Sequence, residues 1–568
     1  MKKNKKVAYL NVFHIITNFV IFSICVLFVP SFLFESKIVY RSFGGFFRYP
    51  NDINSSSDTY VSQMNLDKAW DIATGFDLYT IGVIDSGINN SSLDFAGVIN
   101  TSFSYDCSGS NRSPFDDLVD HGTCVAGIIG SKGHNNTAKS GVMWTSKIAS
   151  LRCDNPSDYL NHLESPSAVI NAVNRASQSS YYMPILNFSG GFGHLSDVDI
   201  SNDELEDLAE KISLYNGLLV CSAGNGGSKI GSTASNNAIK TLYPQMLNRD
   251  NILVVGGLND QGGVHYSSNY SNEYVDIYAP FSASTVHCDG SVNPFQGTSC
   301  SSPLVAGVAG LILSINPSLS MVQVKSNILN SADYVTVTDI NSPYYPGYKV
   351  LNAYNAVLSS LPSSSVLAST IYSVMPLMNS SYHTNYNWYR IDAIPGQCTF
   401  NMSATNNFVS AELYSDIQSS PIASSSNTNG PFSLSYDFYS SGTYYLKVIN
   451  NSNIPIASYS ISISRPHTHT YSNAYLWRSG TKHLAICSCG SSALRVHAVA
   501  SGGNTCLLCG GPAFGGIVGP VYLNLNDYQA VGLDSFMKSD EIIILGPIDL
   551  ERYLNGELNF EEVFYATI

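Results

Sequence analysis

The sequence predicts a large α/β domain with a doubly wound, mostly parallel sheet, followed by a small all-β sandwich and a small Cys/His-rich module. Between residues 60 and 361, apolar strand-like runs alternate with helix-like segments, which is typical of a parallel sheet covered by helices. Beyond residue 366 the helical periodicity fades, and Tyr, Thr, Val and Ser alternate as in half-buried strands. Beyond residue 466, two close pairs of cysteines follow one another.

Length and composition agree with several folded domains. The chain has 568 residues, which corresponds to about two to four domains. Hydrophobic residues make up 44% and aromatic residues 11% of the chain, so global disorder is excluded. The formal net charge of -14 disfavours a nucleic-acid partner, because binding to phosphates depends on positive charge.

The N-terminus reads as an export segment. Four lysines lie within the first six residues, and residues 7–34 contain no charged residue. A lysine cluster followed by an apolar run is typical of a signal peptide or a signal-anchor, whereas a buried core helix would show a polar face. We therefore expect residues 1–35 to reach or span the membrane and the rest to lie outside the cell. No small-x-small cleavage site follows Phe28, which slightly favours a retained anchor over a secreted protein.

The α/β pattern predicts individual elements. An apolar run over 78–84 predicts a strand, and residues 167–177 predict a helix with Ser165 as its N-cap and Pro166 in its first turn. A second helix is expected over 203–214, followed at once by a strand over 218–221.

Three short segments carry what nucleophilic serine catalysis needs, which is a hydroxyl, a base and a carboxylate that orients the base. Asp85 ends an apolar strand, at the sheet edge where open α/β folds place their sites. His121 leads a small-residue helix and would be the general base. Ser299 lies in a tight turn into a helix whose Pro303 suits the first turn, so it would be the nucleophile at the positive end of the helix dipole. Taken singly, each segment is more often structural than catalytic.

Together and in this order, the segments 81–88, 121–130 and 297–307 resemble the subtilases, the subtilisin-like serine peptidases. The resemblance covers about residues 58–360. It implies a subtilisin-like fold and hydrolysis of peptide bonds by Asp85, His121 and Ser299. The segment 221–226 resembles the family's oxyanion segment, which implies that the Asn225 amide and the Ser299 backbone N–H bind the developing oxyanion.

The resemblance also implies a substrate-binding segment. Residues 186–191 resemble the edge strand that pairs with an extended peptide, so Ser189, Gly190 and Gly191 are expected to bind the substrate backbone. An ordinary strand end is the alternative.

One departure from the family pattern concerns cysteines. Cys300 stands where the family has a methionine, and we expect its side chain to turn into the helix–sheet interface while Ser299 faces the cleft. Cys124 and Cys221 also lie within the matching segments, which predicts sensitivity to mercurials or oxidants if these thiols are unpaired.

The C-terminal parts are less specific. Residues 366–465 resemble the prepeptidase C-terminal β-sandwich found after many secreted bacterial peptidases. The four closely spaced cysteines of the next module could hold one structural zinc or form two disulfides, and both readings stay open. These cysteines are Cys487, Cys489, Cys506 and Cys509.

The sequence thus predicts an extracellular serine endopeptidase, membrane-anchored through its N-terminus or secreted, that acts on protein or peptide substrates as a monomer. Catalysis by the triad needs no cofactor, and no calcium-ligand pattern stands out. A catalytically silent surface adhesin or scaffold and an esterase on the same triad are the alternatives. The expected parts are a signal or anchor segment (1–35), a subtilisin-like domain (58–361), a β-sandwich (366–465), a Cys/His-rich module (466–513) and a C-terminal region without an assigned role (514–568).

Overall fold

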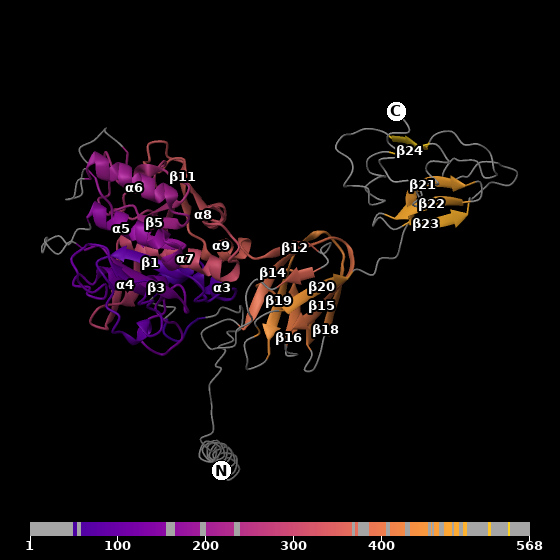
Figure 1. Ribbon diagram of the computed structural model, residues 1–568, viewed down its shortest axis with the longest axis horizontal. Helices are drawn as coiled ribbons and strands as arrows, with labels where there is room; N and C mark the ends of the chain where they lie inside the picture. The colour runs from indigo at the N-terminus through magenta and orange to yellow at the C-terminus, as the bar shows by residue number, and fades with distance from the viewer. Residues whose placement is uncertain are drawn as a thin grey trace, which may run out of the picture. The chain divides into compact units, whose positions relative to one another are not determined.

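The computed structural model divides the chain into two compact units, Met1–Ser464 and Arg465–Ile568 (Figure 1). In the first unit it describes residues 49–53, 58–154, 165–193, 200–231, 239–365, 370–372, 385–404, 409–426, 432–451, 456 and 459–464. In the second unit it describes the backbone of five short strands. The N-terminal export segment, residues 1–35, lies outside the described residues.

A nine-stranded sheet in the order β10-β11-β7-β6-β5-β4-β1-β3-β2 forms the centre of the α/β domain. All its neighbouring strands are parallel except β10 and β11, which pair antiparallel. The strands are β1 (Thr80–Asp85), β2 (Tyr105–Asp106), β3 (Lys147–Arg152), β4 (Ile185–Phe188), β5 (Leu218–Ser222), β6 (Ile252–Leu258), β7 (Ile277–Pro280), β10 (Asp333–Thr336) and β11 (Gly347–Val350). The predicted doubly wound parallel sheet is confirmed.

Helices cover both faces of this sheet (Figure 1). The α helices are α2 (Thr59–Gln63), α3 (Leu66–Trp70), α4 (His121–Gly130), α5 (Pro166–Ser177), α6 (Asn202–Leu214), α7 (Thr298–Ile315), α8 (Met321–Asn330) and α9 (Ala353–Ser359). Ile81 and Val83 of β1 pack with α4 and α7 in one core cluster, whereas Ile84 packs with α5 and α6 in a second. The strand's side chains therefore alternate between two buried faces.

The starts of helices α5 and α6 and of strand β1 lie within two residues of the positions predicted from the sequence. The Ser165 hydroxyl accepts a hydrogen bond from the Ala168 amide at 3.1 Å, so α5 starts where its cap predicted. Helix α6 begins at Asn202, one residue earlier than expected, because Ser201 and Glu204 form a capping box. Strand β1 begins at Thr80 rather than at residue 78, since Leu78 is 48% exposed.

A hairpin and a β-sandwich complete the first unit. The hairpin joins β8 (Ser282–Val286) to β9 (Val292–Gln296). The sandwich has sheets in the orders β12-β14-β19-β16-β17 and β13-β20-β15-β18, which share one apolar core. Its strands are β12 (Ser363–Ser365), β13 (Thr370–Tyr372), β14 (Tyr386–Ala393), β15 (Gly396–Ala404), β16 (Val409–Tyr414), β17 (Ala423–Ser426), β18 (Phe432–Phe438), β19 (Gly442–Asn450) and β20 (Tyr459–Ser464). The predicted all-β region after the α/β domain is present.

The second unit contains two small antiparallel sheets. They comprise β21 (Tyr471–Ser479), β22 (Lys482–Cys487) and β23 (Ser492–Val496), and the pair β24 (Val521–Leu523) and β25 (Ile543–Leu545). Cys487 ends β22, but its side chain and the residues Cys489, Cys506 and Cys509 lie outside the described part. The choice between zinc and disulfides stays a prediction.

Across the described residues, one helix is long and apolar enough to cross a bilayer. This is α7, and 94% of its apolar window is buried in the protein. It is the central helix of the α/β core.

Candidate active site

Asp85 lies at the carboxyl end of β1, where the strand order reverses between β3 on one side and β4 on the other. Open α/β sheets place their ligand sites at such a switch point. The Asp85 side chain is only 2% exposed, and its Oδ1 accepts the Ser86 amide at 2.8 Å. The same oxygen lies 2.7 Å from Nδ1 of His121. A buried carboxylate thus fixes the imidazole through Nδ1, so Nε2 is the nitrogen that would take a proton from a nucleophile.

His121 is the first residue of α4, and Gly122 allows it to approach β1. A Cβ on Gly122 would lie 2.1 Å from the Gly87 carbonyl oxygen and 3.1 Å from the Asp85 Cβ. Only glycine fits this position. The His121 ring also meets the Phe295 ring edge to face, with centroids 5.2 Å apart. Its side chain is 29% exposed, so one side of the ring faces the solvent.

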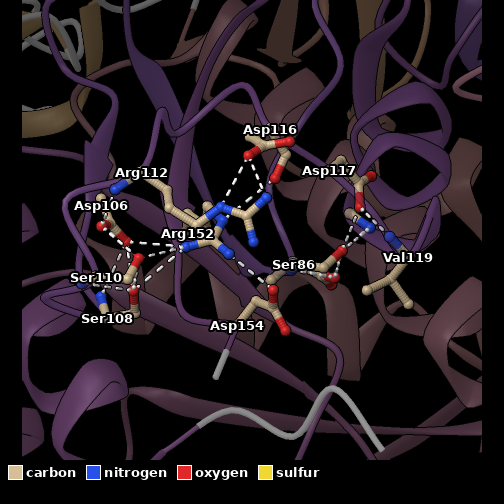
Figure 2. A network of polar contacts seen from close by, with 12 residues as sticks. Ser86, Asp106, Ser108, Ser110, Arg112, Asp116, Asp117, Val119, Arg152 and Asp154 are labelled. Atoms are coloured by element: carbon tan, nitrogen blue, oxygen red, sulfur yellow. Dashed lines mark hydrogen bonds and ion pairs between the residues drawn. The ribbon is translucent and has the colours of Figure 1, made fainter. Parts of the chain in front are cut away.

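Ser86 and Asp117 hold the start of α4 in place (Figure 2). The Ser86 hydroxyl donates to Asp117 Oδ1 at 2.8 Å and accepts the Gly122 amide at 2.9 Å. Asp117 Oδ2 accepts both the amide and the hydroxyl of Thr123, at 2.9 and 2.5 Å. Free amides at a helix start need acceptors, and a carboxylate there also matches the helix dipole. The sequence analysis missed both residues. The signal for Asp117 was its position a few residues before a helix start.

A buried arginine supports the loop that carries Asp117 (Figure 2). The Arg152 side chain is fully buried and pairs with Asp154 at 2.7 Å and Asp106 at 3.2 Å. Its Nε donates to the Asp116 carbonyl at 3.2 Å. Arg152 of β3 is also the register partner of Asp85 in the parallel pairing of β3 with β1. One cation therefore joins the strand beside Asp85 to the loop ahead of α4.

Ser299 is the second residue of α7, and its side chain is close to the Ser189 segment. Gly297 precedes the helix at a φ of 126°, a conformation that favours glycine. The Ser299 hydroxyl donates to the Ser189 carbonyl at 3.4 Å. The Ser299 amide is one of the first helical N–H groups, which have no acceptor within their own helix. It is therefore free to bind an anionic oxygen.

The sequence analysis placed Pro303 in the first turn of its helix, and this prediction is wrong. Helix α7 already begins at Thr298, so Pro303 lies in its second turn. Inside a helix, proline removes the hydrogen bond to the carbonyl four residues earlier, which here is that of Ser299. The Ser189 hydroxyl donates to this carbonyl instead, at 3.4 Å. The proline thus helps to couple Ser299 to the Ser189 segment.

Asn225 follows β5 and is oriented by Thr298. Its Oδ1 accepts the Thr298 amide at 2.8 Å and the Thr298 hydroxyl at 3.0 Å. Because a backbone N–H can only meet an acceptor, this contact fixes the amide with its oxygen toward Thr298. The Nδ2 donor then points away from Thr298, and both Asn225 and Ser299 line one cleft.

That cleft has a volume of about 240 Å³. Ser189, Gly190 and Gly191 are among the residues that line it, and their binding of substrate stays a prediction. Gln245 also lines the cleft, and its amide donates to the carbonyls of Gly190 and Ser222 at 2.9 and 2.8 Å.

The edge-strand reading of this segment needs one correction. Residues 185–188 form β4, an interior strand paired with both β1 and β5. Its backbone groups are already used in the sheet, so a peptide strand could pair only with the residues after Phe188. There the Ser189 and Gly190 carbonyls already accept side-chain hydrogen bonds from Ser299 and Gln245. The strand reads as a near-continuous apolar run, which is typical of a strand buried on both faces.

The cysteines of the matching segments are buried. Cys300 is fully buried in the core cluster with α4 and α7, which confirms the predicted direction of its side chain. Burial raises the pKa values of the Cys124, Cys221 and Cys300 thiols well above their usual range. These thiols are therefore poor nucleophiles at neutral pH.

Comparison with known proteins assigns the α/β domain to a family. Residues 78–351 match the model of the subtilase family. The domain that these residues form belongs to this family. Subtilases are serine endopeptidases, so the family assigns this domain to the hydrolases that act on proteins or peptides.

Two relatives of this subtilase domain show the extent of the similarity. The chain is 28% identical over 312 residues to the thermophilic serine proteinase of Bacillus sp. (strain AK1), covering 54% of this chain and 69% of that protein. It is 28% identical over 311 residues to thermitase of Thermoactinomyces vulgaris, covering 54% of this chain and 99% of thermitase. A solved cold-adapted subtilisin-like serine proteinase is 26% identical with a TM-score of 0.39, covering 49% of this chain and 89% of that one. The similarity is confined to about half of this chain.

Proposed function

We propose that this subtilase is a catalytically competent serine endopeptidase in which Ser299 is the nucleophile, His121 the general base and Asp85 the orienting carboxylate. The hydrogen bond of 2.7 Å between Asp85 Oδ1 and His121 Nδ1 is the observation that carries the proposal. Two residues 36 positions apart meet there in the geometry that a base and its orienting group need.

In the proposed reaction, Ser299 Oγ attacks the peptide carbonyl carbon while His121 Nε2 takes its proton, and buried Asp85 stabilises the imidazolium. The carbonyl oxygen becomes an oxyanion, which the Asn225 Nδ2 and the Ser299 amide bind. His121 then gives the proton to the leaving amine, and the carbon–nitrogen bond breaks. Water hydrolyses the acyl-enzyme by the same steps and restores Ser299.

A substrate would lie extended along Ser189, Gly190 and Gly191. A Cβ on Gly191 would lie 2.9 Å from Leu242 Cδ1 and 3.1 Å from Gln245 Nε2, so a side chain here would have to displace the ends of these two side chains. Backbone pairing with such a segment favours an extended peptide over a compact acyl ester. The esterase reading is therefore the weaker one.

The location belongs to the same proposal. The lysine-rich start and the uncharged run over residues 7–34 support an enzyme that acts outside the cytoplasmic membrane, anchored or secreted. Protease treatment of intact cells, followed by immunoblotting of the catalytic domain, tests this location. A domain that stays protected until the cells are broken would overturn it.

The catalytic assignment is tested by fluorophosphonate labelling of the full-length chain with intact-mass analysis. We expect one adduct, lost in Ser299→Ala and retained in Ser314→Ala, a control serine at the far end of the same helix. No adduct on a folded protein would overturn the proposal and favour a silent scaffold. Casein and an acyl ester, assayed side by side, separate a peptidase from an esterase.

A further inference from the structure

Three potential metal ligands lie together beside the catalytic histidine, on two elements far apart in the chain. Asp120 immediately precedes His121, and Cys124 lies one turn into α4. His287 begins the tip of the hairpin between β8 and β9. One ligand atom from each of these three residues lies within 4.8 Å of the other two. None of the three has a role in the proposed peptidase mechanism.

The distances suit a tetrahedral ion. His287 Nδ1 lies 3.4 Å from Cys124 Sγ and 2.6 Å from Asp120 Oδ2. In a tetrahedral zinc site with Zn–N of about 2.0 Å and Zn–S of about 2.3 Å, the nitrogen and sulfur lie roughly 3.5 Å apart. A nitrogen and an oxygen ligand lie roughly 3.3 Å apart, so the Asp120–His287 contact would open by roughly 0.7 Å. The sulfur–nitrogen edge is already at its bound length.

The charges around the cluster favour a cation. The Asp120 carboxylate brings a negative charge to the cluster, and its Oδ2 lies 2.6 Å from His287 Nδ1. The Asp120 side chain is 38% exposed and that of His287 18%, so the cluster can be reached from solvent.

We propose that Asp120, Cys124 and His287 bind one thiophilic divalent cation of the Zn²⁺ class, with water as the fourth ligand. Mixed sulfur, nitrogen and oxygen donors in a tetrahedral arrangement suit Zn²⁺ better than Ca²⁺ or Mg²⁺, which take oxygen ligands. On binding, the Cys124 S–H bond breaks, sulfur coordinates the ion and the proton passes to solvent. No electron is transferred.

Cys288 is close by but is outside this ligand set. Its Sγ lies 3.1 Å from the Thr123 hydroxyl and 3.6 Å from the Asp117 carbonyl. Its amide donates to Asp120 Oδ1 at 2.6 Å, which leaves Asp120 Oδ2 for the ion. Removing the Cys288 thiol therefore tests the choice of ligands, because Cys288 is not one of the proposed ligands.

A bound ion would fasten the hairpin to the start of α4. The hairpin also carries Phe295, whose ring packs against that of His121 at 5.2 Å. The site therefore joins both elements that hold the catalytic imidazole.

The test is a titration of the full-length chain with Co²⁺, carrying Ser299→Ala to prevent self-digestion. A cobalt–thiolate site gives a charge-transfer band and visible d–d bands, and Zn²⁺ should remove both by competition. The C-terminal cysteines are the same in every variant, so any metal they bind cancels in the comparison. We expect Cys124→Ser and His287→Asn each to bind one equivalent less than the parent protein.

Two controls are matched thiol removals. Cys221→Ser removes a buried thiol from β5 and Cys288→Ser removes the neighbouring thiol, and both should keep the full stoichiometry. Zn²⁺ should also raise the melting temperature of the parent protein more than that of Cys124→Ser, because a ligand of the native state stabilises it. Should Cys124→Ser or His287→Asn fail to fold, the partly exposed Asp120→Asn supplies the same comparison.

Equal metal stoichiometry and equal spectra in the parent protein and in the folded ligand variants would overturn the proposal. Loss of the equivalent in Cys288→Ser would overturn the three-residue ligand set. All these readouts are independent of peptidase activity.

Discussion

Replacing Arg152 by methionine should destabilise the fold strongly, although this residue contacts no substrate. The guanidinium is fully buried between Asp154, 1% exposed, and Asp106, 9% exposed. Removing one partner of a buried ion pair leaves an uncompensated charge and costs about 3–5 kcal/mol. Asp106 keeps hydrogen bonds from the Ser108 and Ser110 hydroxyls, and these bonds outweigh burial and lower its pKa. Most of the loss should come from Asp154, because its carboxylate is the more deeply buried of the two.

Urea unfolding in a Ser299→Ala background measures this loss as a change in midpoint at constant slope. The control is Arg112→Met, which removes a pair with Asp116 at 2.5 Å whose side chains are 29% and 34% exposed. A half-exposed pair of this kind contributes about 0–1 kcal/mol in spite of the shorter distance. Adding Asp154→Asn to Arg152→Met should recover part of the loss. Equal, small losses in both single variants would refute the reasoning that burial, and not distance, decides the effect.

Three further predictions concern the oxyanion donor, the start of α4 and the pH dependence of stability. Asn225→Ala should lower kcat by about 10²–10³, the general value for one oxyanion donor and one known from subtilisins, with little change in KM; an unchanged kcat on a peptide substrate would remove Asn225 from the oxyanion site. Gly122→Ala should lower the free energy of unfolding by about 1–3 kcal/mol, since its Cβ would lie 2.1 Å from the Gly87 carbonyl oxygen, and a thermal melt equal to the parent's would contradict this overlap. Burial, and then Asp67, raise the pKa of Tyr49 to about 12. The stability that protonated Tyr49 gives to the folded state is therefore fully present below about pH 10 and is lost as the pH rises toward 12. Urea midpoints measured from about pH 9 to 11.5 should fall less steeply for Tyr49→Phe, and parallel curves would rule out this contribution.

The local elements could be predicted because their signals lie within a few residues of one another. Ser165 and Pro166 fix the start of α5 through one hydrogen bond to the next turn. The apolar run that ends at Asp85 predicts a strand buried on both faces, and it is one. The segments 81–88, 121–130 and 297–307, taken together and in this order, were enough to identify the family.

Errors arose where a residue's role depends on its neighbours in space. Residues 186–188 carry an edge-strand motif, but β1 and β5 pair with both sides and make β4 an interior strand. Pro303 looked like a first-turn residue because nothing in its own segment shows that α7 already begins at Thr298. In both cases strand order and the packing of the turn decided the outcome.

The sequence by itself determined the α/β pattern, the helix caps and the residue types at the site, because each depends on periodicity and on contacts between near neighbours. Only the tertiary structure decided that the Asn225 amide nitrogen points away from Thr298, and that Arg152 lies between Asp106 and Asp154. It also placed His287 against Cys124, 163 residues earlier in the chain. Such contacts form only when the sheet order brings distant segments together, and hydrophobic periodicity carries no information about which side chains then meet.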